Sequence, residues 1–151
     1  MSDDLRALED WAGALLAKLQ PRERRKLNQD IARDLRRSQQ NRITAQRNPD
    51  GAAFAPRKAR QSFRSKKGRI RRKMFTKLKQ TKHLKLQSTA DSVAIGFIGR
   101  TARLARVHQY GLNDRPGRGA PDVRYSRRLL LGFSSNDTEA IRSLVLDRLS
   151  T

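Results

Sequence analysis

The chain has 151 residues and a formal net charge of +21, from 35 lysines and arginines against 14 acidic residues. This length predicts one domain over residues 1–151, and the absence of cysteine excludes disulfides, thiolate metal sites and thiol nucleophiles. The longest apolar run, near residues 129–133, is far shorter than the ~18 residues that span a bilayer, so we expect no membrane contact. The acidic first residues also lack the pattern of a secretory signal.

The positive charge is concentrated in one part of the chain. Residues 51–90 carry +14 without a single acidic residue, whereas residues 1–20 carry −2. Such density repels itself and favours an anionic partner, either a nucleic acid or an acidic protein surface. The alternative is a solvated basic stretch that has no dedicated partner.

Two amphipathic helices are predicted first. The stripe of the first helix lies at helical spacing, with acidic side chains in its first turns; it comprises Leu5, Leu8, Trp11, Leu15, Leu16 and Leu19. Pro21 ends this helix and opens a second one that extends to about Gln46. The apolar face of the second helix is narrow, formed by Leu27, Ile31, Leu35, either Ser38 or Gln39, and Ile43.

The segment after the second helix begins with a turn. Asn48-Pro49-Asp50-Gly51 is a strong turn pattern, and residues 52–65 are predicted to form an extended, flexible loop. A third, basic helix is predicted over residues 68–80, with Ile70, Met74, Phe75 and Leu78 on its apolar side.

The central part changes to a period of two. Residues 83–87 and 92–99 alternate and predict an antiparallel hairpin, followed by a short helix over residues 101–110 with Gly111 as its C-cap. Residues 112–123 are rich in turn formers and predict a second flexible loop. Residues 124–133 could supply another strand.

The last helix is predicted from its cap and its stripe. Asn136 and Glu139 have capping-box spacing, and Ile141, Leu144, Val145 and Leu149 form the buried side. The predicted fold class is therefore α+β: an N-terminal helical pair, a basic third helix, a small antiparallel sheet and a C-terminal helix.

Catalytic chemistry has little support in the sequence. His83 and His108 are the only histidines, and both are interpreted as structural. There is no phosphate-binding loop, and Asp30 and Asp34 are better explained by ion pairs on a helix surface. We expect no catalytic residues, no metal site, no cofactor and no enzyme activity.

Nucleic-acid binding is the alternative function. Fourteen unopposed cations in segment 57–85 could neutralise phosphates. The sequence has no aromatic stacking strand, zinc finger or clear helix-turn-helix, so any such binding would be sequence-nonspecific.

Six short motifs follow one another along nearly the whole chain: Leu35–Ile43, Asn48–Gly51, Lys67–Phe75, Gly96–Arg100, Ala105–Gly111 and Leu130–Ser134. In this order and spacing they resemble the phage virion morphogenesis family. Ser126 departs from the family pattern, which often has proline after the tyrosine that matches Tyr125.

The resemblance implies a virion structural role. It implies a protein that completes the tail and supports stable head–tail joining, located in the tail or neck of the virion after assembly in the host cytoplasm. A homo-oligomeric ring, most simply a hexamer, is implied. The implied partners are the tail tube or terminator, the head-completion or connector proteins and, nonspecifically, packaged DNA.

Three sets of candidate contact residues follow. A DNA or partner surface is expected at Arg69, Arg71, Arg72, Lys73 and Lys77. A docking loop is expected at Asn48, Pro49, Asp50, Gly51 and Phe54. A subunit interface is expected where the acidic Asp3, Asp4, Glu9 and Asp10 of one copy meet the basic segment of the next, because a closed ring needs two different patches. Ordinary turns and solvated charges are the competing interpretation.

Overall fold

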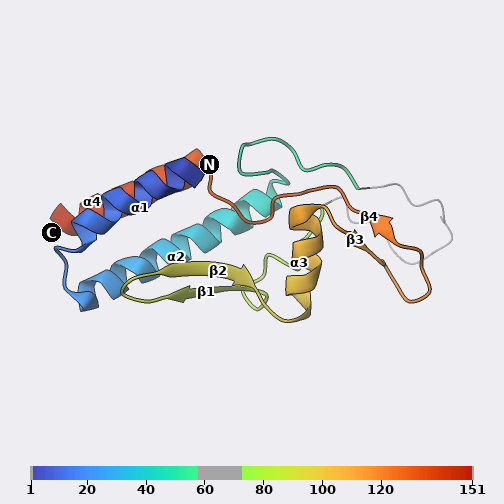
Figure 1. Ribbon diagram of the computed structural model, residues 1–151, viewed down its shortest axis with the longest axis horizontal. Coiled ribbons are helices and arrows are strands. Elements are labelled where there is room, and N and C mark those ends of the chain that lie inside the picture. The colour runs from blue at the N-terminus through green and yellow to red at the C-terminus, as the bar shows by residue number, and fades with distance from the viewer. Residues whose placement is uncertain (1, 58–72, 151) are drawn as a thin grey trace.

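The computed structural model describes residues 2–57 and 73–150, and the fold is α+β, as predicted. The long helix α2 (Pro21–Thr44) runs through the middle of the molecule. Helices α1 (Ser2–Leu16) and α4 (Ser135–Ser150) lie along one side of it, and a hairpin of β1 (Leu84–Ser88) and β2 (Val93–Phe97) lies along the other (Figure 1). Helix α3 (Arg100–Tyr110) stands at the end of the hairpin, beside the short strands β3 (Asn113–Asp114) and β4 (Val123–Arg124).

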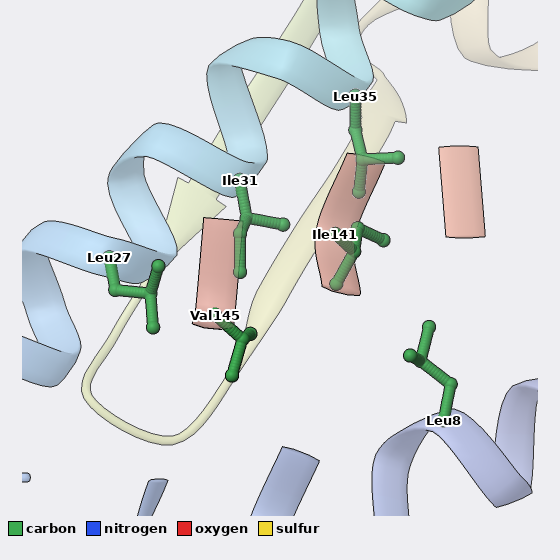
Figure 2. Packing of buried hydrophobic residues seen from close by; sticks show 6 residues of the cluster. All are labelled: Leu8, Leu27, Ile31, Leu35, Ile141 and Val145. Carbon is green, nitrogen blue, oxygen red and sulfur yellow. The ribbon is translucent and has the colours of Figure 1, made fainter. Parts of the chain in front are cut away.

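The first core cluster joins the three longest helices. Leu27, Ile31 and Leu35 form one side of α2, facing Ile141 and Val145 of α4, with Leu8 of α1 beside them (Figure 2). This is the stripe predicted for α2, with Gln39 rather than Ser38 as its fourth buried position. At ~2 kcal/mol for each fully buried aliphatic side chain, this seam is a main source of stability for the helical half.

The hairpin is antiparallel, with Leu84 opposite Phe97 and Ser88 opposite Val93. Its apolar side chains face α2, and Val93 and Ile95 reach the first core cluster. Lys85 and Gln87 point to the exposed side. The predicted hairpin is confirmed.

A second core cluster lies at the other end of α2. It comprises Ile43, Phe54, Met74, Leu78, Ala105 and Leu130, with Phe75 and Phe97 packed against it. The cluster draws residues from most parts of the chain, so it fixes α3 and the loops relative to α2.

The predicted basic helix over residues 68–80 is wrong where the structure describes it. Residues 73–80 form turns, and Phe75 has a φ of 65° that a helix cannot contain. The Gln46 side chain causes this conformation, because its amide accepts from the Met74 N–H and donates to the Met74 carbonyl, both at 2.8 Å. Met74 and Leu78 are nevertheless buried, as the apolar spacing predicts. Residues 68–72 lie outside the described residues.

Two further predictions need correction near the C-terminus. Of residues 124–133, only Arg124 is in a strand, pairing with Asn113. Helix α4 is capped by Ser134 and Asp137 rather than by Asn136 and Glu139: the Asp137 N–H donates to Ser134 Oγ at 3.1 Å, and the Ser134 N–H donates to Asp137 Oδ2 at 3.0 Å. The capping box therefore begins two residues earlier than predicted.

Candidate assembly surfaces

The acidic residues predicted to contact a neighbouring subunit lie on α1. Asp3, Asp4, Glu9 and Asp10 are all exposed, while Leu8 of the same helix is buried in the cluster that it shares with α2 and α4. The helix therefore presents carboxylates outward while its apolar stripe holds it in place. Their contact with another subunit stays a prediction.

Only two of the predicted basic contact residues are described. Lys73 and Lys77 are exposed, and Arg69, Arg71 and Arg72 lie outside the described residues. Lys82 and Lys85 are also exposed, so cations continue from the turns into β1. This lysine surface (Lys73, Lys77, Lys82 and Lys85) could bind either phosphates or carboxylates.

A polar groove of about 640 Å³ lies beside this surface, between α2 and residues 79–82. Lys79 Nζ donates to Thr44 Oγ1 at 2.6 Å, and Gln40 Nε2 donates to the Lys79 carbonyl at 2.7 Å. These bonds tie the groove wall to α2. The Lys79 ammonium therefore bonds within the chain, and we do not count Lys79 among the lysines that could bind an external anion.

The predicted docking loop is tied to the body of the protein. Asp50 and Gly51 are exposed at its tip, Gly51 having a φ of 91°, but Pro49 is buried and Phe54 is only 6% exposed. Asn48 Oδ1 accepts from the Leu129 N–H at 2.9 Å. Phe54 thus belongs to the core, and only the tip of this turn is open to a partner. Of the predicted loop 52–65, residues 58–65 lie outside the described residues.

Beneath this turn, side chains hold residues 129–132 where a strand is predicted. Arg42 donates to the carbonyls of Leu129 and Leu130 at 2.6 and 2.8 Å. Gln39 Oε1 accepts from the Gly132 N–H at 3.1 Å. Since Asn48 and the side chains of α2 satisfy these backbone groups, no neighbouring strand is needed.

Gln109 of α3 completes this polar cluster. Its amide donates to the Leu131 carbonyl at 2.8 Å and accepts from the Leu131 N–H at 3.0 Å. The polar cluster (Gln39, Arg42, Asn48 and Gln109 around residues 129–132) thus brings together four motifs that are separate in the sequence. These roles were not predicted from the sequence, in which the polar Gln39 within an apolar stripe is the one local signal.

Burial shapes the electrostatics of the polar cluster. Desolvation lowers the pKa of Arg42 from its ordinary value, and the nearby Asp137 carboxylate opposes this shift. Arg42 remains a cation, because a guanidinium keeps its proton in proteins. Asp137 in turn accepts a hydrogen bond from Ser38 Oγ, so α2 and the start of α4 share one charged network.

His108 lies in a stack of aromatic rings beside the polar cluster. Its ring centroid is 4.7 Å from that of Phe75 and 4.9 Å from that of Tyr125, both edge-on. Burial, reinforced by the Arg128 cation, lowers the pKa of His108 to about 4, while Asp114 acts in the opposite direction. His108 is therefore neutral at pH 7, and it makes packing contacts inside the chain.

Arg128 lies beside this stack, in contact with the His108 ring. It is 3% exposed, and it donates from Nε and Nη2 to the carbonyls of Ala55 and Pro56 at 2.8 and 2.9 Å. Gly111 ends α3 with a φ of 63°, and a Cβ there would lie 3.2 Å from the Tyr125 carbonyl oxygen. The predicted glycine C-cap is confirmed, and it allows the chain after α3 to return closely beside residues 125–128.

The described residues hold no group of three or more side chains of the metal-binding types. None of the described helices is long and apolar enough to cross a membrane. Asp30 forms ion pairs with Arg33 and Arg148 at 4.0 and 3.0 Å, as expected for a helix-surface carboxylate.

Comparison with known proteins gives two matches over almost the whole chain. The family model described as the phage virion morphogenesis family matches residues 3–150. The chain is 36% identical over 148 residues to the tail completion protein S of Escherichia phage P2, covering 97% of this chain and 98% of that protein. No solved structure matches.

Proposed function

Because the chain belongs to the phage virion morphogenesis family, we propose that it completes the phage tail as a non-enzymatic structural protein of the virion. The observation that carries this proposal is the match to the P2 tail completion protein along 97% of this chain and 98% of that protein. Proteins that align from end to end at this identity share a fold. The resemblance that the motifs indicate is thereby confirmed at the level of the family.

The proposal extends to a ring of identical copies in the neck, six being the number that the resemblance implies. Helix α1, which carries the exposed acids, lies on one side of α2, and the lysine-bearing β1 lies on the other (Figure 1). Two different patches of opposite charge on different sides of one subunit suit a heterologous contact, which can close into a ring. The ring would join the tail tube or terminator to the head-completion or connector proteins.

The internal placement of the family motifs supports a structural role. Gln39, Arg42 and Gln109 form hydrogen bonds to the backbone of residues 129–132 of the same chain. His108 is neutral and enclosed by aromatic rings. These motifs therefore serve the fold, and the acids of α1 and the lysine surface are left exposed for assembly.

The test of the ring is charge reversal on α1. Changing Asp3, Asp4, Glu9 and Asp10 to lysine should shift the protein from an oligomer to a monomer in sedimentation velocity and abolish tail completion in a phage lacking the gene. The matched control reverses four exposed acids elsewhere, Glu23, Asp34, Glu139 and Asp147, and so changes the net charge equally. An unchanged sedimentation coefficient for the α1 variant would contradict this interface.

The alternative, sequence-nonspecific binding to nucleic acid, is tested with the same protein. Anisotropy of a labelled duplex should be measured over a range of salt, because phosphate contacts give affinity that falls steeply with salt. Salt-sensitive binding that weakens in a Lys73→Glu/Lys77→Glu variant would support contact with packaged DNA. Binding by a monomer that coats DNA, without ring formation, would favour the alternative over tail completion.

A further inference from the structure

The hairpin of β1 and β2 has two edges, and its hydrogen-bond pattern determines which backbone groups point outward. The Ile98 N–H donates to the His83 carbonyl at 3.1 Å, and the Thr89 N–H donates to the Ser92 carbonyl at 2.8 Å. In an antiparallel pair, bonded and non-bonded residue pairs alternate. The residues paired between these two points, Lys85 with Gly96 and Gln87 with Ala94, are therefore the bonded ones.

The remaining strand residues direct their N–H and C=O groups away from the hairpin. On β1 these are Leu86 and Ser88, and on β2 they are Val93, Ile95 and Phe97. Within residues 2–57 and 73–150, no backbone partner satisfies these outward groups. Each strand thus offers an open ladder to a further strand.

The outer edge of β2 lacks the features that protect exposed edges in monomers. Lysine, proline and bulges commonly block such edges, but residues 93–98 contain no charge and no proline. All five residues of β2 pair in continuous register. A free, uncharged edge of this kind is a template for a partner strand.

The hairpin is also held rigidly enough to serve as a template. Asn28 Nδ2 of α2 donates to the Thr89 carbonyl at 2.7 Å, and Arg24 forms an ion pair with Asp91 at 3.7 Å. Thr89 Oγ1 accepts from the Asp91 and Ser92 N–H groups. The turn is therefore fixed to α2, and both edges keep their orientation.

We infer that β2 of one copy pairs with β1 of the next copy, so that the hairpins form a continuous antiparallel sheet around the ring; this inference rests on the proposed ring. Rotation about the ring axis keeps β1 of the neighbour antiparallel to β2. Inside each hairpin, the long Lys85 and Gln87 side chains lie opposite the small Gly96 and Ala94. The contact between copies repeats the same combination of long and small side chains.

Head-to-tail pairing, β2 of one copy with β1 of the next, fits the edges better than a two-fold pairing of β1 with β1 or of β2 with β2. Pairing β1 with β1 would bring two Lys85 side chains together, and like charges in neighbouring strands are unfavourable. Pairing β2 with β2 would leave the β1 edge open on every copy. Head-to-tail pairing satisfies both edges of every subunit and closes without a free end.

Cross-linking tests this pairing cleanly, because the chain has no cysteine of its own. Lys85→Cys or Gln87→Cys on β1 is mixed, under mild oxidation, with a differently tagged copy carrying Ala94→Cys or Gly96→Cys on β2. The four combinations cover a two-residue slip in register. The matched control places the cysteine on the exposed face of α2, as Arg33→Cys.

The expected result is a disulfide between the β1 and β2 variants in at least one combination, and none with Arg33→Cys. Disulfides confined to β2 with β2 would overturn head-to-tail pairing. A ring by sedimentation with no strand cross-link would overturn the strand pairing and leave the proposed function standing. A protein that stays monomeric at every concentration would overturn both.

A backbone variant gives an independent measurement. Ser88→Pro removes an outward N–H and leaves every bond inside the hairpin intact, whereas Ser88→Ala keeps the N–H. We expect the proline variant to remain folded, by circular dichroism, but to sediment as a monomer, with the alanine variant still oligomeric. A folded Ser88→Pro protein that still forms the ring would overturn the inference.

Discussion

The sharpest test of the internal polar cluster is removal of the Arg42 side chain. Its guanidinium donates to the carbonyls of Leu129 and Leu130 and, at 2.6 Å, to Gln39 Oε1. Its fourth bond, to the Arg47 carbonyl at 2.9 Å, is exposed and contributes little. Three part-buried bonds at a net ~1 kcal/mol each predict that Arg42→Ala lowers the free energy of unfolding by about 3 kcal/mol. For a chain of this size, that corresponds to a melting temperature lower by about 6–12 °C.

The assay is urea unfolding followed by the fluorescence of Trp11, the only tryptophan, and by circular dichroism. Arg42→Lys should fall between the parent and Arg42→Ala, since one ammonium cannot reproduce the two-pronged guanidinium contact. The matched control is Arg33→Ala on the same helix, whose exposed side chain has one ion pair at 4.0 Å and should cost less than about 0.5 kcal/mol. If Arg42→Ala and Arg33→Ala unfold at the same urea concentration, the guanidinium does not hold residues 129–130 and the reasoning fails.

Two further stability predictions follow from the structure. The pKa of His108 is about 4 in the folded protein and about 6.5 in an unfolded chain, so the unfolded state binds more protons between these values. Stability should fall by about 3 kcal/mol as the pH drops from about 6.5 to about 4; a His108→Gln variant with the same pH profile in urea unfolding would contradict this assignment. Gly132→Ala should cost about 1–3 kcal/mol, because its Cβ would lie 2.5 Å from Pro49 Cγ. Gly13→Ala, in open space on α1, should instead stabilise by up to about 1 kcal/mol, and equal melting temperatures for the two variants would refute the clash.

Local periodicity was sufficient for the elements that bury a regular stripe. Helices α2 and α4 follow their apolar spacing, and the alternation in residues 84–97 gives the hairpin. These elements are predictable because their buried apolar residues recur once per helical turn or at every second strand residue. The ends of these elements are less predictable: α1 ends at Leu16, while its apolar stripe continues to Leu19.

The errors at residues 73–80 and 124–133 share one physical cause. Met74 and Leu78 are buried as helical spacing predicts, yet a side chain 28 residues away, Gln46, bonds both backbone groups of Met74 and imposes a turn. Residues 129–132 form no strand, because the side chains of Arg42 and Gln109 bond the backbone groups that a neighbouring strand would otherwise pair. Bonds between a side chain and a distant backbone leave no periodic trace in sequence.

For the candidate contact residues, the sequence indicates the residue type but not its place in the fold. Charge counting locates the acids of α1, and the structure places them on the surface. Phe54 illustrates the limit: an isolated aromatic residue in a polar loop suggests a contact residue, whereas here it fills the second core cluster. Only the packed structure separates these two uses of the same residue.

The central position of α2 has a consequence for how the chain folds during translation. Its apolar side is covered by α4, whose contact residues Ile141 and Val145 are among the last to be synthesised. More than a hundred residues separate Ile31 from Ile141. At bacterial elongation rates of ~5–20 residues per second, roughly 5–20 s therefore pass between synthesis of α2 and synthesis of the α4 residues that pack on it. Incomplete chains thus lack the contact between α2 and α4, and the helical half can finish folding only after Val145 has been made.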